Sequence, residues 1–198
     1  MEQNIIHVGH AIDVLKKLPE NSIDCVMTSP PYWSQRDYGK NTETIWDENS
    51  KCDHKWNETI KEFTHAGSKT AQIHKGKALE KYTIKTTIGT CKKCGAWNGQ
   101  LGQEDTPEAY YRHLCSIFDE IKRVLKETGT CFVNIGDTYK DNNKLMIPAK
   151  FAIEMQVRGW TLRNEIIWHK TSSIPESVTN RFTNDYEMVY FFTKKPTD

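Results

Sequence analysis

The sequence lacks any long hydrophobic run. None of its apolar stretches approaches the roughly 18 residues that a membrane-spanning helix requires. Residues 1–7 have neither the basic region nor the apolar stretch of a secretory signal peptide. These absences predict a cytoplasmic protein without a membrane partner. In that reducing compartment, we expect the six cysteines to be thiols or metal ligands rather than disulfides.

The sequence also lacks a surplus of either charge. Lys and Arg together number 27, and Asp and Glu number 26, which gives a formal net charge of +1. A DNA-binding face needs a local basic cluster rather than a high average charge, so this balance neither requires nor excludes nucleic acid. The 198 residues are enough for one substantial core and one small appended module.

Short apolar runs alternate with helical patterns along most of the chain. The predicted strands are Ile5–Val8, Ile23–Met27, Cys131–Ile135, Leu162–Trp168 and Met188–Thr193. The predicted helices are Ala11–Leu18, Pro107–Leu125 and Pro148–Val157. This alternation predicts an α/β, Rossmann-like sheet that is mostly parallel. Because no helix separates the last two strands, we expect that pair to be antiparallel.

The composition changes between residues 40 and 106. Lys, Thr, Glu, His and Gly dominate this segment, and the long apolar periodicity disappears. We therefore predict one catalytic domain formed by residues 1–39 and 107–198. Residues 40–106 are predicted to be an inserted module that binds zinc and contacts DNA.

Two short pairs of metal-binding residues lie in that insertion. Cys52 and His54 form the first pair, and Cys91 and Cys94 form a Cys-x-x-Cys knuckle. Two such pairs complete a tetrahedral zinc site, and the metal would stabilise a segment that has few apolar residues. A redox-active Cys-x-x-Cys is the alternative, although the βαβ context of thioredoxin-like chemistry is absent. The cysteines predicted to be core residues are Cys25, Cys115 and Cys131.

A rigid polar turn, Thr28-Ser29-Pro30-Pro31-Tyr32, follows the second predicted strand. Ligands of open α/β sheets bind at the carboxyl ends of the strands, where this turn is expected to lie. An amino group on an aromatic base is a poor nucleophile because its lone pair is delocalised into the ring. Hydrogen-bond acceptors for both amino hydrogens free that lone pair, and the Ser29 side chain and Pro30 carbonyl can supply them. Tyr32 can stack on a base flipped out of the duplex. A stiff turn without chemistry is the alternative.

The turn and its surroundings resemble DNA amino-methyltransferases in which the motifs occur in circularly permuted order. The matching segments are Leu18–Asp24, Tyr32–Gly39, Asn134–Tyr139, Arg163–Lys170, Pro175–Ser177 and Asn180-Arg181. The resemblance implies methyl transfer from S-adenosylmethionine to double-stranded DNA, in a restriction-modification or phage system of a prokaryotic cell. The implied catalytic residues are Ser29, Pro30, Pro31 and Tyr32, and the implied donor contacts are Thr28, Ser29 and Pro30. Within the family, serine before the two prolines favours cytosine N4, whereas aspartate favours adenine N6.

Basic residues in the loops beside these motifs are candidates for contacts with DNA phosphates. Such contacts position a duplex without reading its sequence. The candidates are Arg36, Lys40, Lys92, Lys93, Lys170 and Arg181. Solvated surface charge is the alternative interpretation of each.

Two features depart from the family pattern. The donor-binding Phe-x-Gly-x-Gly motif is absent from the 198 residues, and His10 follows Gly9 where the family usually has aspartate. We therefore expect a fragment, or one subunit of a split enzyme in which a second polypeptide supplies the missing motif. The alternatives are an adenine-N6 enzyme, a non-catalytic DNA-binding subunit, and a methyltransferase that acts on RNA or protein.

Overall fold

The computed structural model describes residues 4–48, 51–57, 59–61, 84–86, 89–172 and 178–196. The chain divides into two compact units, one formed by Met1–Tyr38 with Gln100–Asp198 and the other by Gly39–Gly99. The matching segment at residues 175–177 lies outside the described residues. Among the described helices, none combines the length and the apolar character needed to cross a membrane.

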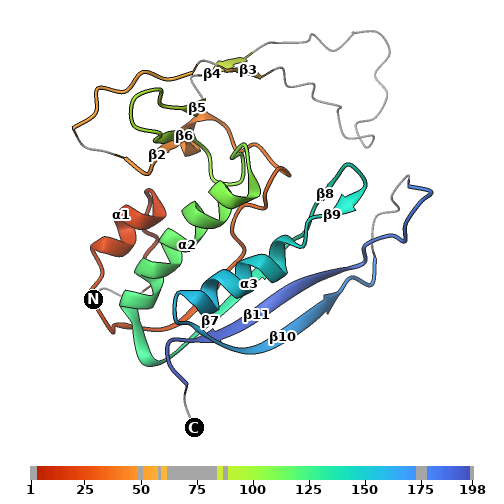
Figure 1. Cartoon of the computed structure of the whole chain (residues 1–198). Helices are drawn as coiled ribbons and strands as arrows, with labels where there is room; N and C mark the ends of the chain where they lie inside the picture. The colour runs from red at the N-terminus through yellow and green to blue at the C-terminus, as the bar shows by residue number, and fades with distance from the viewer. Residues whose placement is uncertain are drawn as a thin grey trace, which may run out of the picture. The chain divides into compact units, whose positions relative to one another are not determined.

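The first unit is built on a four-stranded sheet (Figure 1). Its strands, in spatial order, are β1 (Ile23–Thr28), β7 (Leu125–Ile135), β11 (Tyr186–Thr193) and β10 (Thr161–His169). β1 pairs with β7 in parallel, whereas β11 is antiparallel to both of its neighbours. The expected antiparallel pairing of β10 and β11 is confirmed. The sheet is mixed, because β1, β7 and β10 run in the same direction and β11, which lies between β7 and β10, runs against them.

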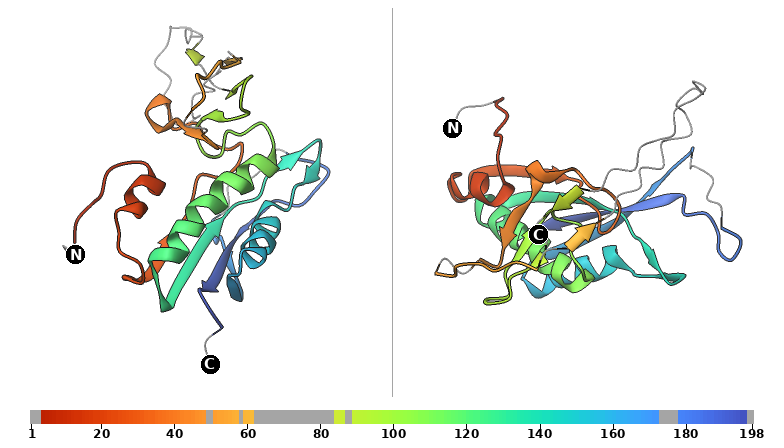
Figure 2. Two further views of the ribbon diagram at one scale, coloured as in Figure 1. Left: turned by 60° about the vertical axis from the view of Figure 1, so that its left-hand side comes forward. Right: turned by 90° about the horizontal axis from the view of Figure 1, so that it is seen from above.

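Two helices, α2 (Pro107–Val124) and α3 (Ile147–Val157), cover one face of this sheet (Figure 2). Thr106 begins α2 by accepting a hydrogen bond from the backbone N–H of Ala109 at 3.2 Å. Phe118 of α2 packs edge-on against Phe151 of α3, and Phe151 packs in the same way against Phe192 of β11. All three rings are fully buried, so the aromatic core joins both helices to the sheet.

The opposite face of the sheet is not covered by the described residues. Phe132 of β7 stacks on Phe191 of β11, with ring centroids 4.7 Å apart. On the flanking strands, Met27 is 80% exposed and Trp168 is 61% exposed. Apolar side chains on one unprotected face of a sheet are typical of a surface that another element covers.

The predicted strand Ile5–Val8 is wrong. These residues form no helix or strand, and Ile6 and Val8 are more than nine-tenths exposed. An apolar run becomes a strand only when a neighbour accepts and donates its backbone hydrogen bonds, and no described strand pairs with it. α1 (Ala11–Lys16) follows it, two residues shorter than predicted. Cys25 is exposed on β1, the edge strand, and is therefore no core residue.

The remaining elements are short. The first unit also contains the hairpin formed by β8 (Tyr139–Lys140) and β9 (Asn143–Lys144). The second unit contains η1 (Lys40–Thr42), β2 (Thr44–Trp46), β3 (Thr59–Lys61), β4 (Ile84–Thr86), β5 (Gly89–Thr90) and β6 (Trp97–Gly99). β6 lies between β2 and β5 in a small sheet, and β3 pairs with β4. Trp46 and Trp97, which pair across β2 and β6, are its largest buried side chains among the described residues.

Candidate active site and metal site

The Pro30-Pro31 turn follows β1 directly, at the carboxyl end of the strand as predicted. The buried Tyr110 of α2 holds it by donating its hydroxyl hydrogen to the carbonyl oxygen of Pro31 at 2.9 Å. Gly102 also lies close to the turn, since a Cβ atom at this position would be 2.9 Å from the carbonyl oxygen of Tyr32. The backbone of Gly102 has a φ of +91°, which also favours glycine. The turn is therefore fixed by contacts from distant parts of the chain.

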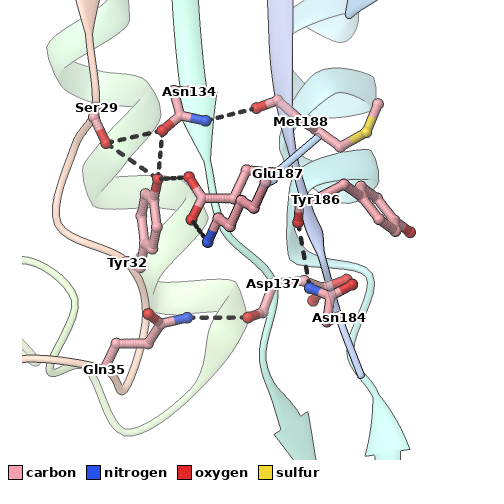
Figure 3. Close-up of polar contacts among 10 residues, drawn as sticks. Ser29, Tyr32, Gln35, Asn134, Asp137, Asn184, Tyr186, Glu187 and Met188 are labelled. Carbon is pink, nitrogen blue, oxygen red and sulfur yellow. Dashed lines mark hydrogen bonds and ion pairs between the residues drawn. The ribbon is translucent and has the colours of Figure 1, made fainter. Parts of the chain in front are cut away.

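Ser29 and Tyr32 join a hydrogen-bond network with residues of β7 and β11 (Figure 3). The Ser29 hydroxyl donates to the Tyr32 hydroxyl at 3.2 Å. The single hydroxyl hydrogen of Tyr32 has two acceptors, Oδ1 of Asn134 at 2.6 Å and Oε2 of Glu187 at 2.9 Å. Asn134 donates its amide hydrogen to the carbonyl oxygen of Met188 at 3.3 Å, which turns Oδ1 towards the two hydroxyls.

The protonation states of Tyr32 and Glu187 follow from their burial and their hydrogen-bond partners. Burial raises the pKa of Tyr32 to about 12, so its phenol is neutral near pH 7. Burial also raises the pKa of Glu187, but hydrogen bonds from Lys170 and Tyr32 outweigh it and leave this pKa below its usual value. Nζ of Lys170 lies 2.5 Å from Oε1 of Glu187. The network therefore contains one carboxylate, balanced by one ammonium group.

The ring of Tyr32 lies against the backbone of Gly136, just beyond β7. A Cβ atom at Gly136 would lie 2.5 Å from two carbons of that ring. Only glycine permits this approach without displacing the ring. Gln35 adds a second connection to the same loop, because its side chain donates to the carbonyl oxygen of Asp137 at 3.0 Å.

A polar pocket of about 370 Å³ opens in front of this network. Its lining residues are Ser29, Pro30, Tyr32, Gln35, Arg36, Tyr38, Lys170 and Glu187. This volume is within the range of sites for small molecules or single bases. Hydroxyl, carboxylate and cationic groups converge on the pocket, which can therefore hold a polar aromatic group and hydrogen-bond its edge.

The structure brings some of the predicted site residues together. Ser29, Pro30 and Tyr32 line the pocket, Pro31 supports the turn, and Thr28 ends β1. Among the basic residues predicted to contact DNA, Arg36 and Lys170 line the same pocket. The other four predicted basic residues are Lys40, Lys92, Lys93 and Arg181.

These four basic residues are not among those that line the pocket. The guanidinium of Arg181 stacks over the ring of Tyr139, 4.0 Å from its centroid. Lys93 of the second unit forms an exposed ion pair with Asp53 at 3.1 Å. Lys40 begins η1, and Lys92 is exposed in the knuckle.

Asn134 and Glu187 were not predicted from the sequence as members of the network. Both lie on the uncovered face of the sheet, where Asn134 comes next to last in β7 and Glu187 comes second in β11. Because β11 is antiparallel to β7, the start of β11 lies beside the end of β7. The predicted antiparallel direction of the last strand could have identified Glu187. An antiparallel strand begins at the edge of the sheet where the parallel strands end.

The second unit brings together all four predicted metal ligands. One ligand atom from each of Cys52, His54, Cys91 and Cys94 lies within 4.8 Å of the other three. The sulfur atoms of Cys52 and Cys91 are 3.9 Å apart, and Sγ of Cys94 is 3.4 Å from Nδ1 of His54. Ligands of a tetrahedral zinc ion, at about 2.3 Å for sulfur and 2.0–2.1 Å for nitrogen, are separated by about 3.5–3.8 Å. The Cys52–Cys91 and Cys94–His54 separations are therefore close to those between the ligands of a zinc ion.

The backbone of the knuckle also fits a metal site. The N–H of Lys93 donates to Sγ of Cys91 at 3.4 Å, and Gly95 follows with a φ of +79°. The ring of His54 stacks on Trp56, which fixes the ring, and Nδ1 is the atom that faces Cys94. Burial raises the pKa of Cys91, but backbone N–H groups including that of Cys94 outweigh it and bring this pKa to about 5.

The sequence matches known proteins over nearly its whole length. Residues 23–198 match the family model of N6/N4 methyltransferases, described as DNA methylase. The type II methyltransferase M.MwoI of Methanothermobacter wolfeii is 33% identical over 98% of this chain and 21% of its own length. M.SfiI of Streptomyces fimbriatus is 30% identical over 96% of this chain and 35% of its own length. The chain thus spans about a fifth of the length of the first relative and about a third of the second.

Two solved structures have the same fold. The cytosine-N4-specific PvuII DNA methyltransferase superimposes with a TM-score of 0.57 at 17% identity, over 96% of this chain and 48% of its own. TTHA0409 of Thermus thermophilus, in complex with S-adenosyl-L-methionine, gives 0.54 at 21% identity, over 97% and 56%. At such identities the likeness establishes the fold.

Proposed function

Because this chain belongs to the N6/N4 family of DNA methylases, we propose that it transfers a methyl group to the exocyclic N4 of cytosine in duplex DNA. The observation that carries the proposal is the network of Ser29, Tyr32 and Asn134 at the edge of a polar pocket. Serine before the two prolines supports cytosine as the target, and adenine N6 is the alternative. Membership of the DNA methylase family favours DNA over RNA or protein as the substrate.

The proposed chemistry depends on hydrogen-bond acceptors at the pocket. The Ser29 hydroxyl donates its own hydrogen into the network, so its oxygen lone pairs remain to accept an amino hydrogen of the base. The carbonyl of Pro30 is the proposed second acceptor. Two acceptors pull the amino nitrogen towards tetrahedral geometry and localise its lone pair for attack. Tyr32, held by Gly136, is proposed to stack on the flipped base.

S-adenosylmethionine is the proposed methyl donor, and when bound it supplies an electrophilic methyl group on a sulfonium sulfur. Thr28, Ser29 and Pro30 form one side of the proposed donor site at the end of β1. The sequence contains no Phe-x-Gly-x-Gly turn to form the other side. We propose that a complementing segment, in the same or a second polypeptide, supplies it. The uncovered apolar face beside β1 supports this proposal, because such a face favours packing by another element.

The proposed DNA partner fits the basic residues of the pocket. Arg36 and Lys170 line the pocket, and we propose that they contact the phosphates that flank a flipped base. We extend this proposed role to Lys40 and Arg181. The names of the relatives support a modification enzyme of a restriction-modification system. A DNA substrate of this kind would place the protein in the cytoplasm of a prokaryotic or phage-infected cell.

We further propose a structural zinc ion bound by Cys52, His54, Cys91 and Cys94. The distances between their ligand atoms support it, as does the small apolar core of the second unit. A metal would join two segments of the insertion that are far apart in the sequence. Its role would be to hold the insertion folded, and no step of methyl transfer requires it.

A reconstitution experiment tests the proposed transfer. The chain is combined with a polypeptide that carries the missing glycine motif, and tritium transfer from labelled S-adenosylmethionine to duplex DNA is measured. Nucleoside analysis then distinguishes N4-methylcytosine from N6-methyladenine. Ser29→Ala removes one acceptor, so we expect a loss of about 10²- to 10³-fold in the single-turnover rate with little change in donor affinity.

Ser22→Ala is the matched control, because Ser22 precedes β1 at the opposite end of the strand. This variant should keep the wild-type rate. A Ser29→Ala enzyme as fast as wild type would contradict the proposed role of the turn. If N6-methyladenine is the product, only the choice of base is wrong. Failure of the wild-type mixture to methylate any duplex would favour a non-catalytic DNA-binding subunit.

A further inference from the structure

The hydroxyl groups of the candidate site form a continuous path that ends on a carboxylate (Figure 3). Ser29 Oγ lies 3.2 Å from the Tyr32 hydroxyl oxygen, which lies 2.9 Å from Oε2 of Glu187. Each hydroxyl can accept a proton on one side while it releases its own on the other. The path begins at the edge of the pocket, where the amino group would bind, and ends at the start of β11.

Of the two groups that accept from Tyr32, only one can take up a proton. Asn134 offers an amide oxygen, which accepts a hydrogen bond but is not a base near neutral pH. Glu187 offers a carboxylate. Asn134 therefore orients the phenol, whereas Glu187 can receive its proton.

We propose that Glu187 is the proton acceptor of methyl transfer, reached from the amino group through Ser29 and Tyr32. This inference rests on the proposed function of the pocket. The amino nitrogen forms its bond to the methyl carbon as the carbon–sulfur bond breaks, with that electron pair remaining on sulfur. The nitrogen is then cationic and gives one proton to Oγ of Ser29. The hydrogen of Ser29 passes to Tyr32, and the hydrogen of Tyr32 passes to Oε2 of Glu187.

The surroundings of Glu187 suit this role. The ion pair with Lys170 keeps the carboxylate charged, in agreement with the lowered pKa of Glu187. A methylated amino cation on an aromatic ring is a much stronger acid than a carboxylic acid, so transfer to Glu187 is downhill. The side chain of Glu187 is 23% exposed and lines the pocket, which gives the proton a path to water after the reaction.

A double-mutant cycle in the reconstituted enzyme tests the path. Glu187→Gln keeps an acceptor for Tyr32 but removes the base, and Tyr32→Phe removes the hydroxyl between Ser29 and Glu187. We expect each variant to lower the single-turnover methylation rate by about 100-fold, the lower end of the range for general base catalysis. The double variant should be no more than about two-fold slower than the slower single variant, because both changes interrupt one path. Affinities for DNA and donor should remain within about three-fold of wild type.

Two further variants separate this role from a structural one. Asp185→Asn removes an exposed carboxylate two residues away, outside the path, and should keep the wild-type rate. Glu187→Asp keeps the base and should recover part of the lost rate. Independent, multiplying effects of the two single changes would overturn the path, as would a Glu187→Gln enzyme with the wild-type rate. Both results leave the proposed function standing if the wild type methylates DNA. A wild-type mixture that transfers no methyl group overturns both proposals.

Discussion

If the proposed zinc ion is bound, replacing Cys91 by serine should remove it and unfold the second unit. Cys91 is buried, and its sulfur lies 3.9 Å from that of Cys52, close to the roughly 3.8 Å between two thiolates on one zinc ion. Trp46 and Trp97, the largest buried side chains among the described residues of this unit, contribute about 2–3 kcal/mol each. Zinc binding by comparable peptides contributes about 10–16 kcal/mol at pH 7. The metal is therefore expected to be the dominant stabilising contribution to this unit.

The assay is metal analysis followed by spectroscopy of the whole chain. Freshly purified protein should contain one zinc per chain, and X-ray absorption should show three sulfur ligands near 2.3 Å and one nitrogen near 2.0–2.1 Å. Cobalt substituted for zinc should give the strong visible bands of a tetrahedral thiolate site. Cys91→Ser should lose the metal, whereas Cys25→Ser, which changes an exposed cysteine outside the cluster, should retain it.

Chelation gives a second measurement that does not depend on a folded variant. Removing the metal should abolish the cobalt signal and expose the tryptophans of the second unit, with a red shift of their fluorescence. Zinc far below one equivalent in fresh protein would refute the reasoning, as would a coordination shell without sulfur. A disulfide between Cys91 and Cys94 in protein purified under reducing conditions would point instead to redox chemistry.

Two more outcomes follow from the first unit. Gly136→Ala would place a Cβ atom 2.5 Å from the Tyr32 ring, so the free energy of unfolding measured in urea should fall by about 1–3 kcal/mol and methyl transfer should slow. An unchanged stability and rate would mean that the ring does not need this approach. Burial raises the pKa of Cys115 and of Cys131 to about 12, so iodoacetamide at pH 8 should label exposed Cys25 and leave these two thiols until the protein is denatured. Rapid labelling of either thiol in the native protein, read by peptide mass spectrometry, would contradict their burial.

Local sequence patterns predicted the parts of the site that depend on local chemistry. The two prolines end β1 because they cannot continue its hydrogen bonding, so the position of Ser29 beyond the strand follows from the sequence. The two short ligand pairs likewise predicted a cluster, and its four side chains converge. The roles of the turn and the presence of the metal stay predictions.

The features that escaped prediction depend on pairing between distant segments. The run Ile5–Val8 is as apolar as a strand, but a strand also needs a partner, which periodicity does not reveal. Glu187 enters the network because β11 inserts between β7 and β10, and nothing in the local sequence specifies that order. The residue pattern of β11 is compatible with a place at the edge of the sheet as well as with its place between β7 and β10.

The position of β11 also constrains how the protein can fold during synthesis. β11 is the last described strand to leave the ribosome, yet it lies in the interior of the sheet, and among the described strands it is the sole partner of β10. Until β11 arrives, β10 and the edge of β7 expose unpaired backbone groups, which is a state prone to aggregation. The hydrogen bond from Tyr32 to its carboxylate partner Glu187 joins residues 155 positions apart in the sequence, so it cannot form before β11 has been synthesised. The network of Ser29, Tyr32 and Glu187 is therefore incomplete until β11 has paired with β7.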